Sequence, residues 1–122
     1  MVKNLFKKEE GALGEKIAAE YLKKQGFKII DRNFRIRGGE IDLIAIDIDT
    51  LVFIEVKTRR SGEFGTPLEA ISYWKMKALI KTAEFYKVTH PHLPESMRID
   101  AVAIILENDN SVASIELVKN IS

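Results

Sequence analysis

Three side chains near the middle of the sequence, Asp42, Glu55 and Lys57, have the types and spacing of a hydrolytic centre. If the intervening turn is centred on Ile48-Asp49, the antiparallel register of its two strands places Asp42 opposite Glu55. Directly opposed Cβ atoms lie about 4.5–5.5 Å apart, where two negative charges repel each other. Side chains alternate along a strand, so Lys57 lies on the same face as Glu55. The pattern predicts that two carboxylates and an ammonium group converge.

A divalent cation between the two carboxylates would remove their repulsion. Mg²⁺ prefers oxygen ligands, keeps several waters and is often held by one or two carboxylates together with a substrate phosphate. Such an ion polarises a phosphodiester and lowers the pKa of a bound water. Lys57 would then orient or deprotonate that water, or stabilise the negative charge that develops. These residues therefore predict phosphodiester hydrolysis assisted by Mg²⁺ or Mn²⁺.

The alternative is an ordinary exposed sheet face, on which Lys57 pairs with Glu40 across the strands. The apolar runs Leu43–Ile46 and Leu51–Ile54 argue against it, because they predict strands that are covered on both faces. Charges on such strands are costly unless they are paired or bind a metal. The hydrolytic interpretation is therefore favoured.

Two glutamates on the first predicted helix differ in their neighbours. Glu20 has lysines at helical-neighbour positions, which predicts an exposed, ion-paired face. Glu15 has only small residues at those positions: Gly11, Ala12, Ala18 and Ala19. Its carboxylate is left accessible, either to join Asp42 and Glu55 or to remain a surface side chain.

Several basic residues lie near the predicted site. Lys75 falls within the inward stripe of the second predicted helix, where it would either meet an anion or extend to the edge of the sheet. Lys77 lies on a more solvent-facing side beside Trp74, where it would contact phosphate or keep the helix soluble. For Arg35, two interpretations stay open: it would contact a nucleic-acid backbone, or it would pair with Asp42.

Three arginines flank the predicted strands of the site: Arg37, Arg59 and Arg60. Contacts of this kind position a nucleic-acid backbone without reading its sequence. Further along the chain, Asp100 opens an apolar strand, where it would hold Arg98 or brace the site.

These residues must be positioned by helices and strands, which hydrophobic periodicity predicts. Helices are expected at 11–25 and 68–87, and strands at 27–37, 40–46, 51–59, 97–106 and 112–118. Gly26 ends the first helix, and Gly38-Gly39 forms a turn between strands. The order α-β-β-β-α-β-β predicts an α/β fold, with a mixed sheet flanked by helices.

The composition restricts the remaining possibilities. The 122 residues, 46% of them hydrophobic, suit one domain over 1–122. The net charge of +1 does not point to a polyanion, so any nucleic-acid contact must rest on local clusters. The absence of cysteine excludes disulfides and thiolate sites and favours the cytoplasm. Met1–Glu10 is charged and no long apolar run follows, so we expect neither export nor a membrane partner.

The sequence resembles a known nuclease superfamily. Residues 39–45, Gly-Glu-Ile-Asp-Leu-Ile-Ala, and residues 53–59, Phe-Ile-Glu-Val-Lys-Thr-Arg, resemble the D…ExK core of the PD-(D/E)xK nucleases. More narrowly, the chain resembles the uncharacterised bacterial YraN-like family, which is related to Holliday junction resolvases. Other segments fit this family in order: Gly14-Glu15, Gly26-Phe27, Asn33, Phe64-Gly65 and Arg98-Ile99-Asp100. Ile41 stands where the superfamily pattern has proline.

The resemblance implies a restriction endonuclease-like fold and an active site of Glu15, Asp42, Glu55 and Lys57, with Lys75 matching a lysine of the second helix. It implies Mg²⁺ or Mn²⁺ held by Asp42, Glu55 and Glu15, and an endonuclease or exonuclease acting on DNA rather than RNA, with branched or repair intermediates among its substrates. A two-fold substrate would call for a homodimer. The alternative is a non-catalytic nucleic-acid-binding adaptor with the same fold.

Overall fold

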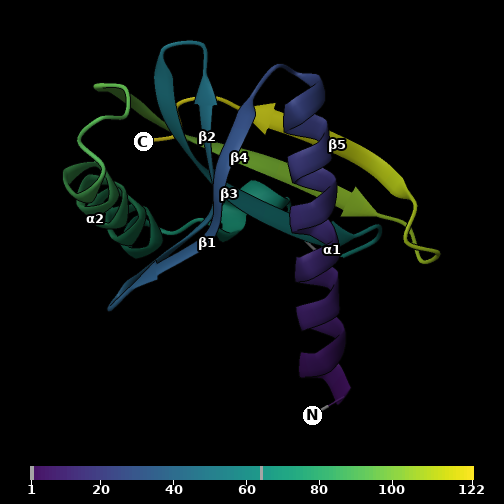
Figure 1. Cartoon of the computed structure of the whole chain (residues 1–122). Coiled ribbons are helices and arrows are strands. Elements are labelled where there is room, and N and C mark those ends of the chain that lie inside the picture. Colours follow the sequence, from purple (N-terminus) through teal and green to yellow (C-terminus); the bar gives the residue numbers. More distant parts are fainter. Residues whose placement is uncertain (1, 64) are drawn as a thin grey trace.

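A five-stranded mixed sheet forms the centre of the molecule, with one long helix on each face (Figure 1). The computed structural model describes residues 2–63 and 65–122, so Phe64 lies outside the described residues. The elements are α1 (Val2–Lys24), β1 (Lys28–Ile36), β2 (Gly39–Asp47), β3 (Thr50–Arg60), the 3₁₀ helix η1 (Pro67–Ala70), α2 (Tyr73–Thr89), β4 (Ser96–Leu106) and β5 (Val112–Val118). Within the described part of the chain, no helix is long and apolar enough to cross a membrane.

The strands follow one another in the sheet in the order β1-β2-β3-β4-β5. All neighbours are antiparallel except β3 and β4, which are parallel from Thr50↔Ser96 to Arg60↔Leu106. A parallel pair needs a crossover connection, and η1 and α2 supply it. The predicted mixed α/β sheet with helices packed on it is confirmed.

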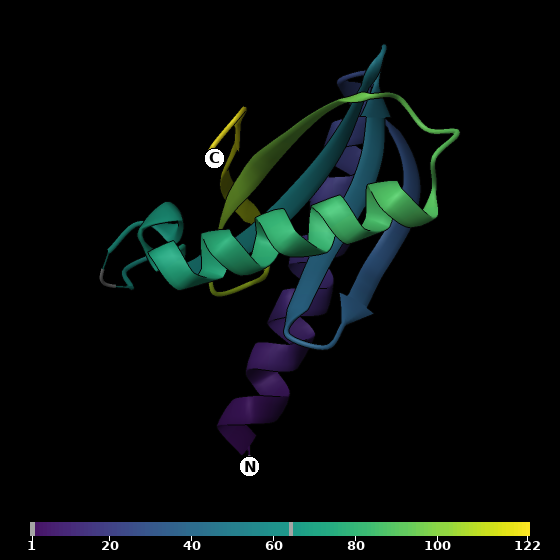
Figure 2. The same cartoon turned by 90° about the vertical axis from the view of Figure 1, so that its left-hand side faces the viewer.

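Both faces of the central strands are buried, as the apolar runs predict. Leu43, Ala45, Val52 and Ile54 pack toward α1, in a cluster with Ala18 and Leu22. The alternate residues Ile44, Leu51 and Phe53 pack toward α2, in a cluster with Leu79 and Tyr86. Figure 2 shows α2 lying across the sheet face that is turned to the viewer. The sheet is therefore the middle of three layers.

Helix α1 ends where the sequence predicts and begins earlier. Gly26 has a φ of 95°, and the N–H of Phe27 donates to the carbonyl of Leu22 at 3.0 Å, which closes the helix. The helix starts at Val2 rather than at Gly11. Lysine and glutamate before Gly11 favour helix without an apolar stripe, so periodicity does not detect this part.

Helix α2 starts at Tyr73, so the predicted start at Leu68 is wrong. The side chain of Ser72 accepts a hydrogen bond from the N–H of Lys75 at 3.1 Å and caps the helix. The preceding Pro67–Ala70 turn is a separate 3₁₀ helix. The buried side of α2 carries Leu79, Thr82 and Tyr86, and the turn at Leu68 is not part of this helix.

The two hairpins differ in how well their registers were predicted. In the second, Ile46↔Leu51 and Ile44↔Phe53 pair as expected. In the first, Ile36↔Gly39 pair, so the turn is Arg37-Gly38 and not Gly38-Gly39. Arg35 consequently lies opposite Glu40, with 3.4 Å between the guanidinium and the carboxylate. The predicted pairing of Arg35 with Asp42 is wrong.

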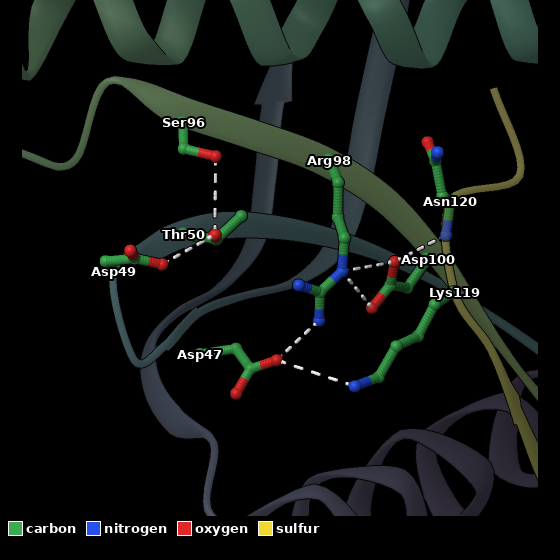
Figure 3. Close-up of polar contacts among 8 residues, drawn as sticks. All are labelled: Asp47, Asp49, Thr50, Ser96, Arg98, Asp100, Lys119 and Asn120. Atoms are coloured by element: carbon green, nitrogen blue, oxygen red, sulfur yellow. Dashed lines mark hydrogen bonds and ion pairs between the residues drawn. The ribbon is translucent and has the colours of Figure 1, made fainter.

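A charge cluster joins the start of β4 to the end of β2 and to the C-terminal segment (Figure 3). Nε of Arg98 donates to both oxygens of Asp100, at 3.0 and 3.1 Å, and Nη2 donates to Asp47 Oδ2 at 2.7 Å. The backbone N–H of Asn120 donates to Asp100 Oδ1 at 2.9 Å. Of the two predicted roles for Asp100, holding Arg98 is the one found.

Candidate active site

The side chain of Asp42 occupies the split between β2 and β3. The pairing of these strands runs from Asp47↔Thr50 to Leu43↔Ile54. Beyond it, the backbone N–H of Val56 donates to Asp42 Oδ2 at 2.8 Å. Because a strand N–H anchors one oxygen, the orientation of the carboxylate is fixed.

Glu55 lies next to this split and is almost completely buried, with 3% of its surface exposed. Its Oε1 is 3.4 Å from Nζ of Lys57 and 3.6 Å from Nζ of Lys75. Its Oε2 is buried and has no hydrogen-bond partner among the described residues. Leaving a buried carboxylate oxygen unpaired is costly, so this atom is suited to bind a cation.

Lys57 points to Glu55 and not to Glu40, whose partner is Arg35. The alternative of an exposed Glu40–Lys57 pair is therefore wrong. Lys75 reaches the same carboxylate from the opposite layer, because α2 packs very closely on β2. A Cβ on Gly39 would clash with Thr82 Oγ1 and approach the carbonyl oxygen of Ala78 to 3.2 Å. Only glycine permits this distance between helix and strand.

Glu15 approaches the split from α1. A Cβ on the preceding residue, Gly14, would clash with Thr58 Oγ1, so glycine allows the helix to contact β3 here. The Asn33 side chain, in the orientation that satisfies both groups, donates to the two Glu15 oxygens at 3.1 and 3.2 Å. Asn33 has a φ of 51°, a left-handed conformation that asparagine tolerates better than most residues. No role for Asn33 was predicted from the sequence pattern.

The pKa values of all three carboxyls are raised. Burial raises the pKa of Glu55 most, the Asp42 charge raises it further, and the two lysines oppose both effects. Burial also raises the pKa of Asp42, against the hydrogen bond from Val56. For Glu15, burial and then the charge of Asp42 raise the pKa. Burial and the charge of Asp42 therefore disfavour the ionised forms of Glu55 and Glu15, and a nearby cation would favour them.

The arrangement fits a cation held by a pair of carboxylates. Within residues 2–63 and 65–122, no group of three or more His, Cys, Asp or Glu side chains is spaced to hold a metal. Asp42 and Glu55 would hold the ion together, with water and phosphate completing its coordination, as is common for Mg²⁺. Glu15, predicted as a third ligand, does not form such a group with them, and both of its carboxylate oxygens accept from Asn33.

Of the four residues predicted to contact nucleic acid, two are bound to other groups of the protein and two are exposed. Arg60 is held by two contacts within the protein: its Nε lies 2.9 Å from Glu10, and its Nη1 donates to the carbonyl of Glu107 at 2.8 Å. Arg59 is half-buried and donates to the carbonyl of Thr58. Arg37 is exposed at the β1–β2 turn, and Lys77 is exposed on α2. Arg37 and Lys77 are thus the better placed of the four to contact a backbone.

The chain is similar to known proteins over nearly all of its length. The model of a family described as "Uncharacterised protein family UPF0102" matches residues 14–104, a range that contains Glu15, Asp42, Glu55, Lys57 and Lys75. A UPF0102 protein of Clostridium botulinum is 46% identical over 114 residues, which is 93% of each chain. One of Caldicellulosiruptor saccharolyticus is 44% identical over 93% of this chain and 97% of its own length. These names state no activity.

Proposed function

The chain belongs to the uncharacterised protein family UPF0102, and from the geometry around Glu55 we propose that it is a Mg²⁺- or Mn²⁺-dependent nuclease that hydrolyses phosphodiester bonds of DNA. The observation that carries the proposal is the buried, unpartnered Oε2 of Glu55, next to the Asp42 carboxylate and two lysines. In a purely structural ion-pair cluster, both carboxylate oxygens of Glu55 would have a partner.

Asp42 and Glu55 would hold the metal ion. Asp42 is anchored by Val56, and Glu55 is fixed between two lysines, so little ordering is needed when the ion binds. When bound, the ion would polarise the phosphodiester and increase the acidity of a coordinated water. Both carboxylates would be ionised in this state, because the charge of the cation would offset the burial that raises their pKa values most.

Lys57 and Glu15 would act beside the two metal ligands. Nζ of Lys57 lies 3.4 Å from Glu55 on a partly exposed side chain, where it can donate to an attacking water or to the negative charge that develops on phosphate. Glu15 has a raised pKa and is held by Asn33, which suits it to exchange a proton with water near Asp42. Lys75 keeps Glu55 oriented from the α2 side and provides a second positive charge.

The fold supports this proposal by analogy. A mixed sheet between two helices, with a D…ExK pair at the split of two central strands, agrees with the restriction endonuclease-like fold of the PD-(D/E)xK superfamily. DNA is proposed as the substrate because resolvase-related members of that superfamily act on it. A fold alone does not define activity, so the proposal depends on the site.

The test is a cleavage assay on single-stranded, duplex and branched DNA and on matched RNA, with Mg²⁺ or Mn²⁺ and with EDTA. We expect metal-dependent cleavage of DNA that Asp42→Asn abolishes. Glu20→Gln is the matched control, since Glu20 lies on the exposed side of α1 and pairs with Lys23 at 3.6 Å. Nucleic-acid binding without cleavage under any of these conditions would replace the nuclease by the adaptor function.

A further inference from the structure

Two large aromatic side chains stand exposed at the start of α2. Trp74 is 74% exposed and Tyr73 is 65% exposed, and their rings meet edge to face with centroids 5.3 Å apart. Nζ of Lys77 lies 5.1 Å from the centroid of the Tyr73 ring and 5.8 Å from that of Trp74. Contiguous exposed apolar surface marks interaction sites, where tyrosine and tryptophan are enriched.

This aromatic pair adjoins the candidate active site. Lys75, which reaches Glu55, belongs to the same turn of α2 as Tyr73 and Trp74. A hollow of about 350 Å³ lies beside this turn, lined in part by Lys75, Ala78, Arg35 and Glu40. Ala78 follows Trp74 by one helical turn, so both lie on the same side of the helix. Trp74 thus lies one helical turn from Ala78, which lines this hollow together with Lys75 of the site.

We propose that Tyr73, Trp74 and Lys77 form a stacking platform for unpaired bases of single-stranded DNA whose backbone passes Lys75 into the site. The inference rests on the proposed function and specifies its substrate. Aromatic rings stack on any unpaired base, and neighbouring lysines attract the phosphates, which is how sequence-independent single-strand binding works. Bases of an intact duplex are stacked on one another and do not reach such a platform.

The charge of this face favours nucleic acid over a second copy of the chain. Residues 73–83 contain Lys75, Lys77 and Lys81 and no acidic residue. In a two-fold contact these lysines would face their own copies and repel. Against a polyphosphate the same charges are attractive, and binding releases counterions.

Trp74 provides the measurement, because it is the one tryptophan of the chain. In EDTA, which prevents cleavage, the fluorescence of the wild-type protein would be titrated with an oligothymidylate. The comparison ligands are an abasic strand of the same length and a blunt duplex. We expect saturable quenching by the oligothymidylate, and at least tenfold weaker binding of the other two. Equal affinity for the abasic strand would show that phosphate contacts act alone and would overturn the platform.

Variants test the individual rings. Tyr73→Ala, followed by Trp74 quenching, and Trp74→Ala, followed by anisotropy of a labelled oligothymidylate, should each lower the affinity on the order of tenfold. Val88→Ala is the control, an apolar residue that is 76% exposed on the same helix. Thermal melting of each variant verifies its fold. Unchanged affinity in both ring variants would disprove the inference.

The remaining outcomes separate this inference from the nuclease proposal. Binding to the platform in EDTA, with no cleavage when metal is added, would support the platform and reject the nuclease. Metal-dependent cleavage that Trp74→Ala leaves unchanged, without quenching, would reject the platform and keep the nuclease. Self-association that Trp74→Ala abolishes, with no response to oligothymidylate, would assign the aromatic pair to a dimer interface and overturn the platform.

Discussion

Nζ of Lys75, on α2, lies 3.6 Å from Oε1 of Glu55, on β3, so the α2 layer and the sheet meet at one buried carboxylate. Replacing Lys75 by methionine removes a charge that lowers the pKa of Glu55, so we expect this pKa to rise further. Weaker metal binding and a cleavage rate about tenfold lower should follow at neutral pH, with a recovery toward higher pH. Lys81→Met, on the exposed side of the same helix, should leave the pH–rate profile unchanged.

The next prediction concerns stability and pH. A carboxyl whose pKa is raised by folding stabilises the native state fully below its unfolded value, and this stability is lost as pH rises through the folded value. The Asp42 pKa is raised from its ordinary value of 3.8, mainly by burial. In EDTA, Asp42→Asn should therefore melt at a higher temperature than the wild type at pH 7, and the difference should shrink toward pH 4.

Adding Mg²⁺ or Mn²⁺ should reverse that order at pH 7. An ion that binds only the folded protein stabilises it by about 1.4 kcal/mol when its free concentration is ten times Kd. The wild type should gain this stability and Asp42→Asn should not. The proposed ion site would be contradicted if millimolar metal left the melting temperature of the wild type unchanged and calorimetry detected no binding.

The two glutamates of α1 give a matched pair. Glu15 contacts Asn33, and burial and then the charge of Asp42 raise its pKa, whereas Glu20 is exposed and paired with Lys23. Glu15→Gln should lower the cleavage rate at least tenfold with little change in unfolding free energy, and Glu20→Gln should change neither quantity by much. If both variants behave alike in the same assay, Glu15 has no special role.

Much of the fold was predictable because local signals agreed. The apolar runs around Asp47–Thr50 admit one compact turn, which defines the register that brings Asp42 near Glu55. Two adjacent glycines made the first turn ambiguous, since either can adopt a positive φ. Only Gly38 does so, with a φ of 88°, so the turn moved by one residue and the partner of Arg35 by two, from Asp42 to Glu40.

Contacts between layers were not predictable in the same way. The Lys75–Glu55 contact depends on how closely α2 packs on Gly39, and the Glu15–Asn33 contact depends on the packing of Gly14 on Thr58. Neither distance follows from periodicity within one element. For the same reason, the pairing of Arg60 with Glu10 was missed and its role as a phosphate contact was predicted instead.

Substitutions in the charge cluster of Arg98 should lower the free energy of unfolding and leave activity unchanged. Asp100 is fully buried, so Arg98→Met leaves it without its two side-chain hydrogen bonds and should cost about 3–5 kcal/mol in urea unfolding. Arg98→Met/Asp100→Leu should recover part of this loss. Arg35→Met, which breaks an exposed pair, should cost under about 1 kcal/mol. Activity per folded molecule should stay near the wild-type value.

The last prediction assigns Lys57 to the chemical step. Its ammonium lies 3.4 Å from Glu55 on a partly exposed side chain, while Asp42 and Glu55 are the proposed metal ligands. Lys57→Met should therefore still bind metal, weakened no more than Lys75→Met through the higher pKa of Glu55, and at saturating metal it should lower the single-turnover cleavage rate by on the order of 10²-fold or more. Asp42→Asn should instead lose metal binding and cleavage together.

Measuring metal binding and cleavage on the same purified Lys57→Met protein separates catalysis from structure. A structural partner of Glu55 would, when removed, lower stability and weaken metal binding through a higher Glu55 pKa, with cleavage restored at saturating metal. A catalytic lysine leaves the rate low at every metal concentration, because the missing ammonium acts on the reacting phosphate or water. If Lys57→Met cleaves at the full rate at saturating Mg²⁺, Lys57 takes no part in the chemical step. If Asp42→Asn is active as well, the adaptor function is preferred for this protein.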